Sequence, residues 1–257
     1  MSDALLSQDP AAASRRAFVA QLGAGGLALA ASACASGASA AAAPATSPAP
    51  VQSAAATSPG RSAPPLPIPP TSEDGPWDHS WLERVASARH KLVFDVGAYQ
   101  EGAGLYYAKN YFNGMRDGWS ISTPDVIAIL GISGDAYPLI FNDAMWEKYT
   151  YGVSSKTNDP RTKATATRNV FWQPRTGEPM DEFGVDVLQK RGAQFIFCNN
   201  VFRGVIRGAM ARTRRPYAEV RAELKANMLP GVVVVPAMVA AMSMAQAAGA
   251  GYVYAGA

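Results

Sequence analysis

From residue 91 onward, short apolar runs alternate with segments that have the spacing of helices. The runs occupy residues 91–97, 125–131, 193–198, 231–236 and, more briefly, 252–254. Each is nearly continuous in apolar residues, which is typical of strands buried on both faces of a parallel sheet. Right-handed crossovers between such strands predict an α/β fold, with three α/β/α layers around a mostly parallel sheet of about five strands.

The segments between these runs carry apolar residues three or four positions apart. In residues 103–116, one helical face collects Leu105, Ala108, Phe112 and Met115. The same reasoning predicts helices near residues 142–149, 182–191, 200–212, 217–227 and 237–248, with a polar, irregular excursion at 152–180. Asn199 or Asn200 is expected to cap the helix that follows the third strand, because asparagine is a favoured N-cap residue.

The first third of the chain has a different composition. Residues 22–70 contain one charged residue, Arg61, whereas 17% of all 257 residues are charged. Arg15 and Arg16 precede a weakly apolar stretch and then small residues, which is the layout of a cleavable twin-arginine export signal over residues 1–34. The alternative is an Ala-rich tail that carries two arginines by chance. The signal predicts a periplasmic or other extracytoplasmic location by the Tat pathway.

Cys34 directly follows the small residues of this segment, which is where a lipoprotein carries its modified cysteine. Ala31 stands where leucine is usual in such signals, so a lipid anchor at Cys34 stays an open alternative. Residues 35–76 are expected to be a disordered linker rich in Ala, Pro and Ser. Nine prolines fall between residues 35 and 70, and such a segment buries too little apolar surface to offset its ordering entropy. The folded domain is expected over residues 77–257.

Charge and motifs exclude several classes of function. The net charge is +3 and no dense Lys/Arg run occurs, so we expect no binding to nucleic acid. His79 and His90 are expected in one helical stretch, three turns apart, and no metal site is predicted. The glycine-rich loop at residues 97–104 is neither GxGxxG nor a Walker motif, and no GxSxG occurs, so no cofactor is expected.

Cys198 is the one cysteine of the predicted domain, and it falls between a predicted strand and the N-terminus of a helix. In parallel sheets, ligands bind beyond the carboxyl ends of the strands. The positive end of a helix favours a thiolate, which can attack a sulfur atom or hold a persulfide. A free cysteine can equally pack as a small apolar residue, since cysteine is among the most buried residue types. Both interpretations stay open.

Other candidate residues lie in loops that should share the sheet edge with Cys198. Gly97 and Gly102 can let backbone N–H groups approach an anion, or they can simply form a tight turn. Glu101 is either a proton donor or acceptor, or a solvated loop carboxylate. Arg203 either binds an oxyanion such as phosphate or a sulfur oxyanion, or lies on a solvated helix face. The remaining candidates for ligand binding are Asn199, Asn200, Pro236 and Met238.

Three segments together resemble the DsrE/DsrF-like family. They are Phe94-Asp-Val-Gly-Ala98, Phe195-Ile-Phe-Cys-Asn-Asn200, and Val232-Val-Val-Val-Pro-Ala237 followed by Ala245-Gln-Ala-Ala-Gly-Ala-Gly-Tyr252. The resemblance covers about residues 88–257 and rests on the order and spacing of these motifs. It implies a small three-layer α/β fold that assembles into homo-trimers or hexamers. It also implies sulfur handling, because some members relay sulfane sulfur as a cysteine persulfide.

In this resemblance, Cys198 matches a cysteine common at the end of the third strand, and the implied partner is a small sulfur anion or a thiol donor. The export signal, the linker and the excursion at residues 152–180 depart from the cytoplasmic relay proteins of the family. We therefore expect an exported protein that binds or relays sulfane sulfur on Cys198, and any enzymatic activity would be sulfur transfer. The alternative is a non-catalytic, oligomeric periplasmic binding module in which Cys198 is structural.

Overall fold

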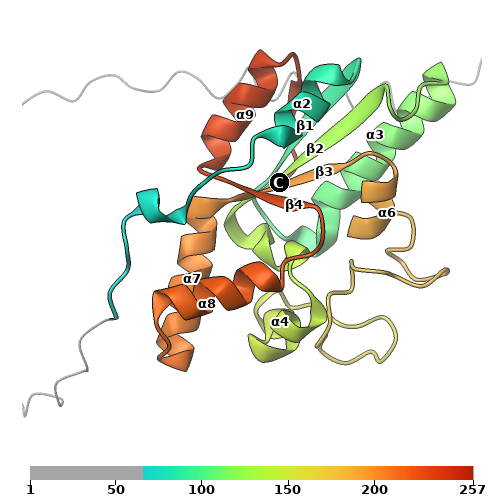
Figure 1. The fold of residues 1–257 in the computed structure, drawn as a ribbon. Coiled ribbons are helices and arrows are strands. Elements are labelled where there is room, and N and C mark those ends of the chain that lie inside the picture. Colours follow the sequence, from blue (N-terminus) through green and yellow to red (C-terminus); the bar gives the residue numbers. More distant parts are fainter. Residues whose placement is uncertain (1–65, 257) are drawn as a thin grey trace, which may run out of the picture. The chain divides into compact units, whose positions relative to one another are not determined.

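The computed structural model describes residues 66–256 (Figure 1). The expectations for the export signal, for Cys34 and for the linker up to residue 65 lie outside the described residues. The described chain forms a five-stranded sheet in the order β4-β3-β2-β1-β5, and every neighbouring pair is parallel. The strands are β1 His90–Val96, β2 Val126–Ile132, β3 Gln194–Cys198, β4 Val232–Val235 and β5 Gly251–Tyr254. The predicted α/β fold with five parallel strands is confirmed.

Helices connect these strands in the predicted alternation. The α-helices are α2 Ser80–Ser87, α3 Ala103–Trp119, α4 Asp143–Lys148, α5 Tyr151–Ser154, α6 Val185–Lys190, α7 Asn199–Thr213, α8 Tyr217–Ala226 and α9 Met238–Ala247. Three short 3₁₀ helices, η1 Thr71–Asp74, η2 Gln100–Gly102 and η3 Gly134–Ile140, were not predicted from the sequence. Within residues 66–256, no helix has the length and apolar character needed to cross a membrane.

Alternate residues of the strands enter two separate hydrophobic clusters, because successive side chains of a strand point to opposite faces. Phe94 of β1 and Phe195 of β3 belong to the first cluster, together with residues of α3, α6, α7 and α8. Ile129 of β2 and Ile196 of β3 belong to the second cluster, together with residues of α2 and α9. Helices α2 and α9 contact each other, as Figure 1 shows. Apolar helix residues therefore cover the strand side chains on both faces of the sheet. Because both faces are buried, consecutive strand residues are apolar, and each strand appears in the sequence as a continuous apolar run.

The strand order explains why α9 packs in a different cluster from the earlier connecting helices. The chain steps from β1 through β2 and β3 to β4 in one direction across the sheet, and then returns past β1 to add β5 on the far side. A right-handed crossover places its helix on one face for one direction of travel and on the opposite face for the reverse. The connections that leave β1, β2 and β3 therefore share the first cluster, and the connection from β4 to β5 lies in the second.

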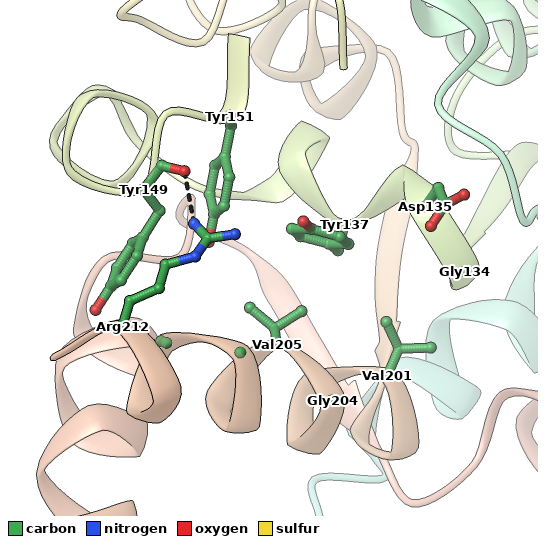
Figure 2. Close-up of a pocket in the computed structure, with 11 residues that line it drawn as sticks. Gly134, Asp135, Tyr137, Tyr149, Tyr151, Val201, Gly204, Val205 and Arg212 are labelled. Atoms are coloured by element: carbon green, nitrogen blue, oxygen red, sulfur yellow. Dashed lines mark hydrogen bonds between the residues drawn. The ribbon is translucent and has the colours of Figure 1, made fainter. Parts of the chain in front are cut away.

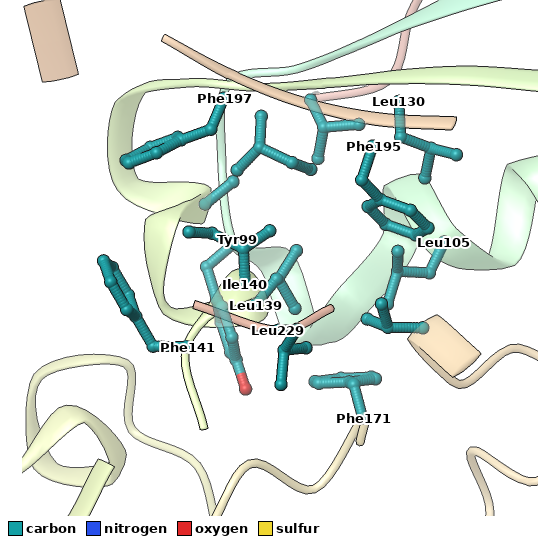
Figure 3. Close-up of a cluster of buried hydrophobic side chains, with 14 of the residues drawn as sticks. Tyr99, Leu105, Leu130, Leu139, Ile140, Phe141, Phe171, Phe195, Phe197 and Leu229 are labelled. Atoms are coloured by element: carbon teal, nitrogen blue, oxygen red, sulfur yellow. The ribbon is translucent and has the colours of Figure 1, made fainter. Parts of the chain in front are cut away.

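The irregular excursion after α5 is part of the first cluster. Its Phe171 is fully buried among the aromatic and aliphatic side chains drawn in Figure 3. The amide of Asn169 is also fully buried, and it donates to the carbonyl oxygens of Leu139 at 2.9 Å and Phe141 at 2.8 Å. The excursion was predicted to be irregular, and the structure shows in addition that it is anchored to η3 and to the first cluster.

Most helices agree with the sequence, and the structure differs at three places. Tyr151–Ser154 form the short helix α5, although residues 152–180 were expected to be irregular throughout. Gly192 has φ +102° just after α6, and Gly249 has φ +89° just after α9, as expected where a helix ends in a left-handed turn. His90, however, is the first residue of β1 and not part of the preceding helix, because α2 already ends at Ser87. Asn199 is the first residue of α7 and not its cap, because its side chain bonds elsewhere; the N-cap residue is Cys198.

The packed domain begins before residue 77, the boundary expected from composition. Asp74, in η1, has a side chain that is 1% exposed and that receives hydrogen bonds from α7 and α8. The carbonyl oxygen of Pro69 also accepts a hydrogen bond from Arg203 of α7. The last residues of the proline-rich segment therefore pack on the domain through side-chain contacts that composition does not reveal.

Candidate functional site

The predicted convergence of three loops at one sheet edge is confirmed. Because all the strands are parallel, the segments that follow β1, β3 and β4 leave from the same edge. Cys198 is the register partner of Val235, so the loop to α9 starts directly beside it. Gly97 follows β1, which is separated from β3 by β2, and two strand spacings correspond to about 10 Å. Cys198 is thus close to the loop at residues 236–238 and more distant from the loop at 97–104.

Cys198 lies where the connections from neighbouring strands diverge. The chain leaves β3 into α7, which packs in the first cluster, and leaves β4 into α9, which packs in the second. Such a divergence is the switch point at which open α/β sheets bind their ligands. Cys198 is the N-cap residue of the 15-residue helix α7, and its Sγ accepts a hydrogen bond from the backbone N–H of Met238, 3.4 Å away. Cys198 therefore stands at the start of α7, and its thiol contacts the first backbone N–H of α9.

The thiol is also well packed. Cys198 is 6% exposed and belongs to the second hydrophobic cluster with Val235 and Met238. A side chain at Gly131 would place its Cβ 2.7 Å from the sulfur of Met238, so this glycine lets the methionine lie over β2. Pro236 is exposed at the start of the loop, and Met238 is buried at the start of α9.

Asn199 and Arg203, two predicted ligand-binding residues, are bound to Asp74. The Asn199 amide donates to Asp74 at 2.9 Å, and the Arg203 guanidinium donates to the same oxygen at 2.8 Å. The Arg203 guanidinium also donates to the Tyr217 hydroxyl and to the Pro69 carbonyl. We therefore assign Arg203 to holding Asp74 in place, which differs from the predicted role in binding an anion. Asn200, by contrast, is exposed on α7.

Packing explains Gly102, one of the two predicted glycines of the loop after β1. Gly102 is buried with φ +81°, and a Cβ there would lie 2.3 Å from the ring of Phe171. The carbonyl oxygen of Gly97 accepts a hydrogen bond from the N–H of Asp135 at 3.0 Å, and this contact joins the loops that follow β1 and β2. Gly102 therefore serves the tight-turn alternative. A Cβ at Gly97 would meet only the Ser133 hydroxyl oxygen at 3.8 Å, so packing does not require glycine at that position.

Glu101 is exposed and has φ +49°, and it lines a cavity of about 520 Å³, here called the loop cavity. Tyr99, Asp135, Tyr137 and Lys156 line the same cavity. The Tyr99 hydroxyl accepts a hydrogen bond from Thr157 at 2.8 Å, and burial raises the pKa of Tyr99 to about 12. This phenol therefore stays protonated at neutral pH.

A second cavity, of about 310 Å³, lies next to the loop cavity and shares Asp135 and Tyr137 with it. We call it the tyrosine cavity (Figure 2). Its walls are three tyrosines and one face of α7, formed by Tyr137, Tyr149, Tyr151, Val201, Gly204, Val205, Gly208, Ala209 and Arg212, together with Gly134 and Asp135. Burial, followed by the neighbouring phenols, raises the pKa of Tyr151, so its hydroxyl remains a hydrogen-bond donor.

Sequence reasoning did not predict the tyrosine cavity. Tyr137, Tyr149 and Tyr151 precede the irregular excursion, where tyrosines that pack in a core and tyrosines that line a cavity have the same local sequence. Arg212 was noted only as part of a small basic group. One signal was available, namely the pair Gly204 and Gly208, because glycines four apart inside a helix remove side chains from one face.

Comparison with known proteins adds no assignment: the chain matches no protein-family model, no curated protein and no solved structure.

Proposed function

We propose that this protein carries sulfane sulfur as a persulfide on Cys198 and passes it to a thiol acceptor. The observation that carries the proposal is the position of Cys198 at the switch point, where it is the N-cap residue of α7 and its sulfur accepts a hydrogen bond from the first backbone N–H of α9. A thiolate or persulfide is an anion, and helix N-termini present free N–H groups and partial positive charge to an anion.

The chemistry needs no oxidant or reductant beyond the sulfur donor. The Cys198 thiolate attacks the outer sulfur of a donor persulfide, R–S–SH. A sulfur–sulfur bond forms to Sγ while the donor's own sulfur–sulfur bond breaks, and R–S⁻ leaves with the electron pair. The products are the Cys198 persulfide and the donor thiolate. In delivery, an acceptor thiolate attacks the same outer sulfur and releases Cys198 as the leaving thiolate.

The structure suggests which groups would stabilise the sulfur anion. The backbone N–H of Met238 already donates to Sγ, and it would remain within reach of a persulfide sulfur. Arg203 is held by Asp74, so backbone N–H groups take the role that the sequence had suggested for this guanidinium. Thiol chemistry at this position thus depends on the backbone at the start of α9, which substitutions of side chains leave in place.

A second candidate function is a non-catalytic binding module in which Cys198 only packs. The 6% exposure of Cys198 and its place in the second hydrophobic cluster favour this alternative. Alkylation of the native protein separates the two. Labelling of Cys198 at the rate of a reactive free thiol favours the sulfur carrier, and labelling only after denaturation favours the binding module.

The direct test is the intact mass of the full chain after exposure to polysulfide. Because Cys34 is the only other cysteine, the experiment uses a Cys34→Ser background, with Cys198 present or replaced by serine. We expect the protein that retains Cys198 to gain about 32 Da per sulfur atom, reversibly with a reductant. The matched Cys198→Ser protein should gain nothing. An unchanged mass in the folded, Cys198-containing protein would rule out the sulfur carrier and leave the binding module.

A further inference from the structure

The tyrosine cavity has an apolar floor that is open because α7 lacks side chains there. Gly204 and Gly208 lie one turn apart on the face of α7 that lines the cavity, between Val201, Val205 and Ala209. A Cβ added at Gly208 would meet nothing within 4 Å, and one added at Gly204 would meet only the end of the Arg207 side chain at 4.0 Å. Helix stability does not explain two glycines at these positions, since alanine would stabilise the helix at both.

Aromatic rings form the opposite wall. Tyr137 and Tyr151 pack edge to face, with ring centroids 5.4 Å apart, and Tyr149 stacks with Tyr151 at 6.0 Å. The cavity is thus bounded by aromatic rings on one side and by the glycine face of α7 on the other. It therefore suits a flat or slender apolar body.

Two polar groups in the cavity have unused hydrogen-bonding capacity. Tyr151 is 3% exposed, and its hydroxyl has no hydrogen-bond partner among the described residues. A buried hydroxyl without a partner is unusual in a folded protein and calls for one. Figure 2 shows the Tyr151 ring extending toward Arg212. One nitrogen of Arg212 donates to the carbonyl oxygen of Tyr149 at 3.0 Å, and no carboxylate within residues 66–256 forms a salt bridge with this guanidinium.

Charge limits the kind of anion that fits. Arg212 supplies one positive charge, and Asp135 contributes a negative charge to the lining of the same cavity. A dianion such as phosphate would be repelled by Asp135 and only half neutralised by Arg212. A carboxylate carries a single charge on two oxygens, which match the donors of one guanidinium and one phenol.

We propose that the tyrosine cavity binds a small organic monocarboxylate. Arg212 and the Tyr151 hydroxyl hold its carboxylate, and its flat apolar body lies between the tyrosine wall and the face formed by Gly204 and Gly208. This site is separate from the sulfur chemistry at Cys198 and does not depend on it.

The test measures binding of benzoate and 4-hydroxybenzoate to the full chain by calorimetry, with benzamide and inorganic phosphate as uncharged and dianionic comparisons. We expect saturable binding of at least one carboxylate and at least about tenfold weaker binding of benzamide and phosphate, since a hydrogen bond to a charged group contributes that much. Binding of neither carboxylate, or equal binding of benzamide, would overturn the proposal.

Two variants probe the cavity without disturbing the fold. Tyr151→Phe removes a hydroxyl that has no partner in the described part of the chain, so the melting temperature should not fall, whereas carboxylate affinity should fall about tenfold. Gly208→Leu fills the cavity floor and should abolish binding. Gly114→Leu is its matched control, because Gly114 is an exposed glycine inside α3 with nothing within 4 Å of an added Cβ. Undiminished binding by folded Gly208→Leu protein would show that the ligand binds elsewhere and would contradict the proposal.

Discussion

Asp74 shows how one carboxylate attaches the N-terminal end of the described chain to the domain. It accepts hydrogen bonds from Asn199, Arg203 and Tyr217, and Arg221 lies 3.4 Å from it. Burial alone would raise the pKa of Asp74, but the hydrogen bonds of its partners, Asn199 first, hold that pKa below its ordinary value. The folded state is therefore stabilised by the ionised carboxylate.

We expect Asp74→Asn to lower the free energy of unfolding at pH 7 by about 3 kcal/mol, because two part-buried guanidinium groups lose their buried counter-charge. The pKa of Asp74 is lower in the folded than in the unfolded state. Its contribution is thus complete above the unfolded value of about 4 and is lost as the pH falls through the folded value. Urea unfolding at pH 7 and at pH 3 should show a smaller difference between variant and wild type at the lower pH.

The control for this prediction is Glu83→Gln, which removes an exposed carboxylate from α2. A surface substitution of this kind should change the free energy of unfolding by no more than about 0.5 kcal/mol. Equal losses for the two variants at pH 7 would show that Asp74 is not a stabilising anchor.

At the scale of secondary-structure elements, α9 is apolar on its outer side as well as on its buried side. Met238 and Met242 face the second cluster, whereas Val239 is 79% exposed and Met244 is 53% exposed. An amphipathic surface helix normally turns polar residues outward. The outer side of α9 is therefore our candidate for the contact surface of the homo-oligomer that the family resemblance implies.

We expect light scattering after size exclusion to give the wild-type chain a mass of three or six protomers, and Val239→Glu to shift it toward one. In the oligomer, the introduced carboxylate would be buried in an apolar interface without an opposite charge or a hydrogen-bond donor. The free-energy cost of removing it from water disfavours assembly. Val153→Glu is the matched control, because Val153 is 65% exposed on α5 and lies outside this surface. A wild-type chain with the mass of a single protomer would remove the basis of this proposal.

At the scale of the whole molecule, the paired arginines lead us to propose export through the Tat pathway. Replacing both Arg15 and Arg16 by lysine should retain the protein in the cytoplasm, because the export machinery reads the arginine pair and not charge alone. Cell fractionation with an antibody to the domain would measure this. Arg61→Lys is the control, and export of the double-lysine variant at the wild-type level would contradict the signal.

The fold and the candidate site differed in how far they could be predicted. β3 was expected at residues 193–198 and is found at Gln194–Cys198, because a strand buried on both faces leaves a local apolar run. The place of Cys198 at the sheet edge followed from strand direction alone. The role of Arg203 could not be predicted, since its partner Asp74 is 129 residues away in the chain. Gly102 was open to two interpretations until the packing of Phe171 against it became visible.

The sequence by itself thus determined the five strands, the longer helices between them and the edge at which their loops gather, because these depend on periodicity and on the handedness of short connections. Tertiary structure alone decided which polar groups pair with one another and which do not. Arg203 is bound by Asp74, whereas the Tyr151 hydroxyl has no hydrogen-bond partner within residues 66–256. Hydrogen-bond pairing and cavity formation depend on distances between residues that are far apart in the chain. Local sequence patterns do not specify those distances.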